Sequence, residues 1–160
     1  MKKKYLTIFL ISVTMIMYIL EFHPNVLNLF ILLSTVPIYI ISKKSPSAGL
    51  LIYIIVSLSI LSADFYRGTV FLFFYGVIGV FLGMFSHYLN QNILISILNG
   101  IILAISINGM NMTLRLNIQY SNEILLQGLI LFFSIVFSFA TLVICNYIYD
   151  ILYKIENISN

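Results

Sequence analysis

Charged side chains are so rare in this chain that it has too few polar groups to cover a water-facing surface. Only 8% of its 160 residues are charged, whereas 61% are hydrophobic, and the mean hydropathy is +1.08. A soluble domain has about 25% charged and about 45–50% apolar residues, and a disordered chain needs low hydrophobicity with high charge. The composition therefore excludes both classes and predicts a protein embedded in a lipid bilayer.

Apolar runs separated by polar or turn-forming stretches predict six transmembrane helices, because a bilayer core requires about 20 apolar residues per helix. The runs cover approximately residues 5–20, 26–41, 49–62, 69–89, 93–107 and 124–149. Among the stretches between and after them are a predicted turn over 63–68, a longer connection over 108–122 and a polar tail over 150–160. We predict an all-α, polytopic bundle in which residues 1–160 form one domain. The third and fifth runs are short, so a five-span alternative stays open.

The cationic residues divide unevenly between the two sides of such a six-helix bundle. One side holds Lys2, Lys3, Lys4, Lys43, Lys44 and Lys154, and the other holds Arg67 and Arg115. Loops rich in Lys and Arg stay in the cytoplasm. Both termini are therefore expected in the cytoplasm, and the protein is expected in the inner (cytoplasmic) membrane of a bacterial cell.

Polar side chains in lipid are expected to face the interior of a helix bundle. The last span carries one such face from end to end, formed by Glu123, Gln127, Ser134, Ser138, Thr141 and Cys145. Asn99, near the middle of the fifth span, either lines a ligand pocket or makes a hydrogen bond between helices. Gly76, Gly79 and Gly83 of the fourth span are expected to permit close helix packing.

Charged and aromatic side chains gather in the loops that are predicted to face outward. They are Glu21, His23, Asp64, Tyr66, Arg67, Arg115 and Glu123. We expect this group, together with Asn99 and Gln127, to bind a small solute at the mouth of the bundle, where ligand cavities are common. The alternative is that each is an ordinary interfacial residue.

The chain shows none of the sequence patterns that catalysis or cofactor binding would require. It has no His-Glu-x-x-His, Gly-x-Ser-x-Gly or P-loop pattern. The histidines His23 and His87 are predicted on opposite sides, and Cys145 is the one cysteine, so no metal site is expected. There is also no basic patch of the kind that binds nucleic acid. We expect a protein that is no enzyme, that uses no cofactor and that depends on partners for energy.

The middle of the chain resembles the substrate-binding S component of energy-coupling factor (ECF) transporters. The resemblance covers roughly residues 26–90: a run from Leu33 to Ile41 that contains Pro37, the Lys43-Lys44 loop with Gly49, and the Gly76-x-x-Gly79-x-x-x-Gly83 helix. The chain departs from the family in its first predicted span, which lacks the Ala-x-x-x-Ala face that many members carry.

This resemblance implies a specific role. In that family the S component binds a vitamin or similar micronutrient, works with a transmembrane T component and two cytoplasmic ATPases, and is thought to topple in the membrane. The loops joining helices one to two and three to four help to close the site, which implies roles for Glu21, His23, Asp64, Tyr66 and Arg67.

Two other functions stay open. One is a non-transport scaffold of envelope assembly, like the rod-shape protein MreD, and the other is an immunity protein against a membrane-active peptide. A scaffold needs a lateral contact face and no cavity, whereas a transporter needs an outward cavity lined by polar groups such as Asn99.

Overall fold

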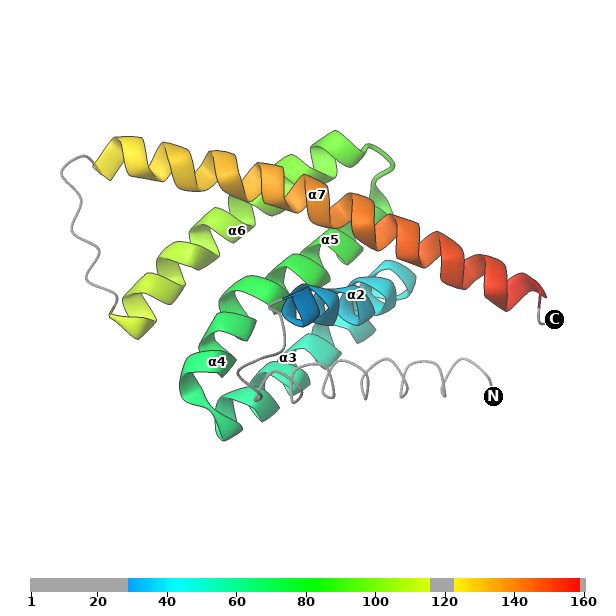
Figure 1. Ribbon diagram of the computed structural model, residues 1–160, viewed down its shortest axis with the longest axis horizontal. Coiled ribbons are helices and arrows are strands. Elements are labelled where there is room, and N and C mark those ends of the chain that lie inside the picture. The colour runs from blue at the N-terminus through cyan, green and yellow to red at the C-terminus, as the bar shows by residue number, and fades with distance from the viewer. Residues whose placement is uncertain (1–28, 116–122, 159–160) are drawn as a thin grey trace.

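All regular structure in the computed structural model, which describes residues 29–115 and 123–158, is helical (Figure 1). The elements are α2 (Leu29–Lys44), α3 (Pro46–Ala63), α4 (Phe65–Val70), the π-helical turn η1 (Phe71–Tyr75), α5 (Gly76–Tyr88), α6 (Asn92–Leu114) and α7 (Glu123–Ile158). Because α4, η1 and α5 follow one another without a break, they form a single helical rod from residue 65 to residue 88. The prediction of an all-α fold is confirmed.

Four of these helices are long and apolar enough to cross a membrane. They cover Pro46–Ala63, Phe65–Tyr88, Asn92–Leu114 and Ile124–Lys154, with hydropathies between 1.9 and 2.6. The protein is therefore a multi-pass membrane protein. The first predicted span, 5–20, lies outside the described residues, so six spans and two cytoplasmic termini stay predictions.

The turn predicted over residues 63–68 is present but much shorter than expected, because only Asp64 interrupts the helices there. Asp64 has an extended backbone, and its carboxylate accepts a hydrogen bond from the backbone N–H of Arg67 at 3.1 Å. A side-chain acceptor at this position satisfies an N–H that the first turn of a helix leaves free. The polar residues of the predicted turn therefore start the next helix.

The predicted ends of the last two spans also need correction. α6 does not stop at residue 107 but continues to Leu114, where Arg115 ends it in a left-handed conformation with φ 50°. α7 does not stop at residue 149 but runs for 36 residues to Ile158, about 54 Å at 1.5 Å per residue. Residues 108–114 and 150–158 are polar compared with the spans, but no proline breaks either stretch.

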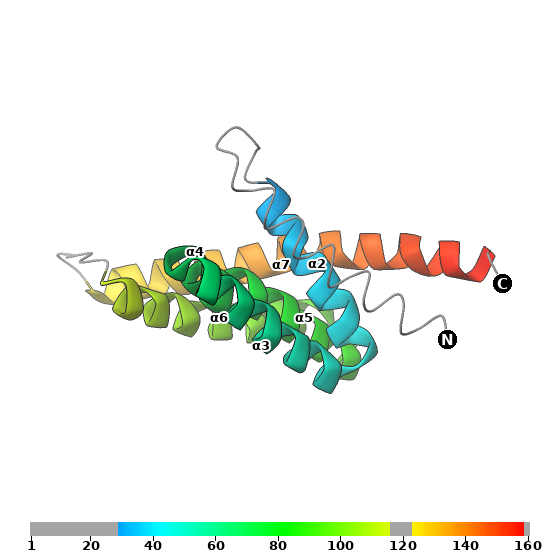
Figure 2. The same ribbon diagram turned by 90° about the horizontal axis from the view of Figure 1, so that it is seen from below.

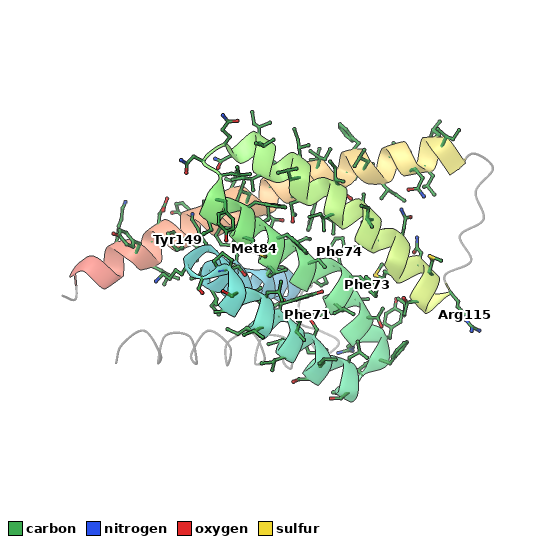
Figure 3. The ribbon with its side chains drawn as sticks, turned by 180° about the vertical axis from the view of Figure 1, so that it is seen from behind. Phe71, Phe73, Phe74, Met84, Arg115 and Tyr149 are labelled. Atoms are coloured by element: carbon green, nitrogen blue, oxygen red, sulfur yellow. The ribbon has the colours of Figure 1, made fainter. Side chains whose placement is uncertain are left out.

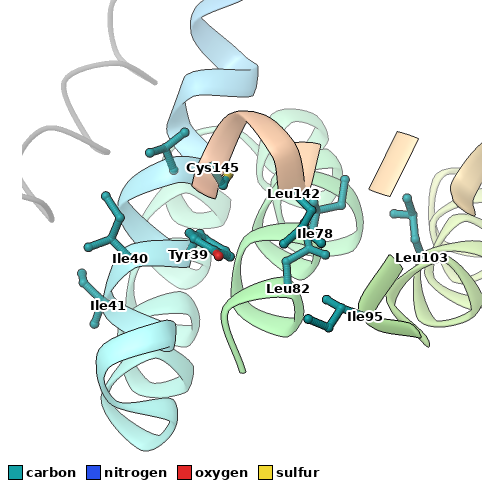
Figure 4. Close-up of a cluster of buried hydrophobic side chains, with 10 residues drawn as sticks. Tyr39, Ile40, Ile41, Ile78, Leu82, Ile95, Leu103, Leu142 and Cys145 are labelled. Atoms are coloured by element: carbon teal, nitrogen blue, oxygen red, sulfur yellow. The ribbon is translucent and has the colours of Figure 1, made fainter. Parts of the chain in front are cut away.

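The centre of the bundle is a backbone-to-backbone contact between α2 and α5. A Cβ atom added at Gly79 would lie 2.8 Å from the carbonyl oxygen of Thr35, and one added at Gly83 would lie 2.6 Å from that of Tyr39. α2 crosses the other helices steeply (Figure 2) and is buried from Ser34 to Ser42. The buried cluster beside it joins α2, α5, α6 and α7, and includes Tyr39, Leu82 and Leu142 (Figure 4).

Tyr53 of α3 contacts the π-helical turn. The N–H of Gly76 bonds to the carbonyl oxygen of Phe71, and the Tyr53 hydroxyl donates to the carbonyl oxygen of Leu72 at 2.7 Å. A Cβ added at Gly76 would lie 2.6 Å from the nearest carbon of the Tyr53 ring, so the ring occupies this space. A carbonyl displaced from the helical ladder thus finds a partner, as lipid requires.

The connections gather at two opposite ends of the bundle (Figure 1). The α2–α3 and α5–α6 connections lie at what we call the lysine end. Lys43 and Lys44 also lie there, but they form the last turn of α2 and not the loop expected from the sequence. The α3–α4 turn and the end of α6, with Arg67 and Arg115, lie at the arginine end. Successive helices therefore alternate in direction, as the sequence analysis assumed.

The glycine contact predicts a sharp difference between two alanine substitutions. Gly83→Ala should destabilise the bundle by about 1–3 kcal/mol, the usual cost of overpacking, because its Cβ would lie 2.5 Å from that of Ser42. Gly128→Ala is the matched control, since nothing lies within 4 Å of its Cβ. It should be neutral or up to about 1 kcal/mol stabilising through helix propensity. Unfolding in mixed micelles measures both, and equal effects would contradict the contact.

Candidate functional site

At the arginine end, the structure brings together two of the predicted binding residues. The Arg67 Nε atom lies 3.5 Å from the Asp64 carboxylate, and the two side chains are 36% and 33% exposed. They are three residues apart, so this ion pair supports the start of α4. Tyr66 is exposed beside them, and Arg115 is exposed at the end of α6 (Figure 3). Glu21 and His23 lie outside the described residues, as does the side chain of Glu123.

Gln127 makes a contact that the sequence did not predict. Its amide faces that of Asn108, with Asn108 Nδ2 donating to Gln127 Oε1 at 3.0 Å and Gln127 Nε2 donating to Asn108 Oδ1 at 3.3 Å. Asn108 belongs to the stretch that was expected to be a connection. It contacts α7 because α6 extends through this stretch. A reciprocal amide pair therefore joins α6 to α7 near the arginine end.

Asn99 lies deep in the same helix pair. It is fully buried, and its Nδ2 donates to the Ser138 hydroxyl at 2.9 Å. The structural bonding expected as one alternative is therefore present. Its Oδ1 has no hydrogen-bond partner among the described residues, and neither has the buried Ser134 hydroxyl one turn away on α7. An acceptor and a hydroxyl in the bundle interior thus retain capacity for another polar group.

The polar face predicted on the last helix turns inward along much of its length. Ser134, Ser138, Thr141 and Cys145 are all buried, whereas Gln127 is exposed. Gly100 allows α6 to approach α7 closely, since a Cβ added at Gly100 would lie 2.7 Å from the Cα of Ile135. We call the set Asn99, Asn108, Gln127, Ser134, Ser138 and Thr141 the polar seam.

A second polar cluster lies at the lysine end, where α7 meets α2. The Oδ1 atom of Asn146 accepts two hydrogen bonds, from the Tyr39 hydroxyl at 2.5 Å and from Lys43 Nζ at 2.7 Å. The Lys43 ammonium also lies 4.3 Å from the centre of the Tyr149 ring and 5.4 Å from that of Tyr39. Ring faces attract cations, so the amide and two rings hold this lysine in place.

His87 joins the lysine-end cluster through the backbone. Its Nδ1 lies 2.8 Å from the Lys43 carbonyl oxygen, which can only accept, so Nδ1 carries the proton. The sequence indicates only an orientation signal at Lys43, and Asn146 is not among the predicted site residues. One signal was available: Asn146 follows Cys145, the last residue of the predicted polar face.

The chemistry that these clusters offer is hydrogen bonding. In the part of the chain that the structure describes, no three His, Cys, Asp or Glu side chains lie where they could share a metal ion. The buried members of the polar seam supply an amide and hydroxyls in a low-dielectric interior, where an unpaired polar group is costly. They are Asn99, Ser134, Ser138 and Thr141. Such groups either lock helices together or bind a polar molecule.

Comparison of the chain with known protein families, with curated proteins and with solved structures finds no match. The resemblance to ECF S components therefore stays a prediction.

The contact between Asn99 and Ser138 predicts measurable coupling between the two positions. In a double-mutant cycle, Asn99→Leu and Ser138→Ala should interact by about 0.6–1.7 kcal/mol, the range for hydrogen bonds between membrane helices. Ser59 is the matched control, because its exposed hydroxyl bonds to Ile55 of its own helix. Asn99→Leu and Ser59→Ala should add to within about 0.5 kcal/mol. If Asn99→Leu and Ser138→Ala also add to within about 0.5 kcal/mol, the hydrogen bond between the two side chains does not form.

Proposed function

We propose that this protein is the membrane-embedded binding subunit of an uptake system for a small polar solute of the vitamin or micronutrient type. Energy would come from a transmembrane T component and cytoplasmic ATPases, as in the ECF transporters that the sequence resembles. The substrate would bind in the polar seam between α6 and α7. It would enter from the arginine end, which the distribution of cations predicts to face outward.

The incomplete hydrogen bonding of the polar seam is the observation that carries this proposal. Asn99 Oδ1 and the Ser134 hydroxyl are buried and have no partner among the described residues. Leaving a buried polar group unsatisfied costs about 1–3 kcal/mol. Apolar side chains of similar size would avoid that cost, so the retention of both groups supports a role in recognising a ligand.

A route from the arginine end to these groups also supports the proposal. Asn108 and Gln127 lie on the same seam, between the exposed helix ends and Asn99. Two neutral amides that bond to each other can exchange that contact for a polar solute at little net cost. Asp64, Tyr66, Arg67 and Arg115 lie at the same end and would attract or orient the solute.

The scaffold alternative is favoured by a different observation. α2 and α5 touch backbone to backbone at Gly79 and Gly83, and Asn99 bonds Ser138. A rigid, non-transporting bundle, such as an MreD-like scaffold or an immunity protein, needs such contacts and no bound solute. The two functions therefore differ in whether a small molecule occupies the polar seam.

Purification from native membranes, followed by mass spectrometry of bound small molecules, distinguishes these functions. We expect a polar solute to co-purify with the wild type. Asn99→Leu should reduce its occupancy about tenfold or more, as expected when a buried hydrogen bond to a ligand is lost. The control Asn90→Leu removes an exposed amide at the lysine end and should not change occupancy.

Two outcomes would count against the proposal in different ways. A solute that stays bound in Asn99→Leu and in Arg67→Ala would show that the site is elsewhere. Wild-type protein that carries no small molecule, and gives vesicles no uptake when its host's ATPases are present, would favour the scaffold.

A further inference from the structure

We propose that the lysine end holds a binding site for the phosphate group of an anionic phospholipid, built from Lys43, Asn146 and His87. This inference does not depend on the proposed uptake function. It rests on how the lysine is held, on which donors around it stay unused, and on where tyrosines place the cluster relative to the bilayer.

Lys43 is held in place by neutral groups. Its contacts within the described residues are the Asn146 amide oxygen and the faces of Tyr39 and Tyr149. Asp150 is exposed one turn further along α7 and acts on Lys43 electrostatically. These contacts fix the position of the ammonium group. Among the described residues no carboxylate lies in direct contact with it, so it can attract an anion.

Several hydrogen-bond donors remain around this charge. An ammonium has three N–H donors, and the bond to Asn146 uses one of them. The Asn146 Oδ1 atom accepts from both Tyr39 and Lys43, which fills its two lone pairs and leaves the two N–H donors of the same amide outside these contacts. Phosphate oxygens are strong acceptors for such donors.

His87 anchors the backbone of the same lysine. Its Nδ1 is committed to the Lys43 carbonyl oxygen, and the ring is exposed. The second ring nitrogen, Nε2, lies outside this contact. The hydrogen bond to the Lys43 backbone keeps this ring beside the lysine.

Tyrosines near the cluster indicate the depth at which it would lie in a bilayer. α7 carries Tyr147, Tyr149 and Tyr153 around it, and Tyr149 is labelled in Figure 3. Tyrosines mark the boundary between hydrocarbon and water, and basic pockets between membrane helices bind anionic headgroups. A free phosphate ion has the same chemistry, but it lacks acyl chains to lie against the apolar sides of α2 and α7.

The test measures lipid binding to the purified full chain in micelles at 0.15 M salt, by native mass spectrometry. Phosphatidylglycerol should bind at least about tenfold more tightly than phosphatidylcholine. Lys43→Gln should weaken phosphatidylglycerol binding about tenfold or more, because a charge-assisted bond is lost. Lys154→Gln is the matched control: it removes the same charge from the same end, at an exposed position, and should cost about twofold or less because salt screens it.

Four results would overturn the proposal. Equal losses in Lys43→Gln and Lys154→Gln would indicate a diffuse basic surface. Equal binding of the two lipids would show that the headgroup charge is not read. Inorganic phosphate that displaces the lipid at millimolar concentration would identify a site for the free ion. If Lys43→Gln fails to fold, His87→Ala removes the ring that bonds to the Lys43 carbonyl oxygen and should still weaken phosphatidylglycerol binding about threefold, because the lysine loses this anchor; an unchanged affinity would refute the site.

Discussion

The contact between α2 and α5 positions most of the other features. Lipid gives helices no hydrophobic reason to associate, so close packing of small residues has to supply the attraction. Gly79 and Gly83 let the α2 backbone reach α5, and α2 is buried from Ser34 to Ser42. Tyr39 and Lys43 are thereby carried to α7, where Asn146 binds both. The lysine-end cluster therefore depends on the close approach of α2 to α5 at these two glycines.

The polar seam and the lysine-end cluster differ in the polar groups that they contain. In the seam, neutral amides and hydroxyls lie between α6 and α7, and some of their hydrogen-bonding capacity is unused. At the lysine end a cation is held by an amide and two rings. A solute and a lipid headgroup make different demands, since one has to be released and the other can remain. The neutral seam suits reversible binding, and the fixed charge suits a lasting anionic contact.

The sequence was sufficient to predict what depends on composition and helical periodicity. Scarce charge predicted a helical membrane protein, and the spacing of Ser134, Ser138 and Thr141 predicted an inward face. It was insufficient where a residue's role depends on a distant partner. Tyr39 and Asn146 are 107 residues apart, so no local pattern indicates their contact. Asn108 was predicted to lie in a connection, but it lies in the extension of α6. Asp64 looked like part of a turn because a helix cap and a turn use the same residue types.

Thiol labelling of whole cells tests most directly whether the two ends of the bundle lie across the bilayer from one another. In a Cys145→Ala background, single cysteines would replace Ser47 or Gln91 at the lysine end, and Ala63 or Arg115 at the arginine end. A membrane-impermeant maleimide should label Ala63→Cys and Arg115→Cys in intact cells, and should reach the other two only after the cells are opened. Equal labelling of all four in intact cells would contradict the membrane-spanning bundle, and with it both proposed binding sites.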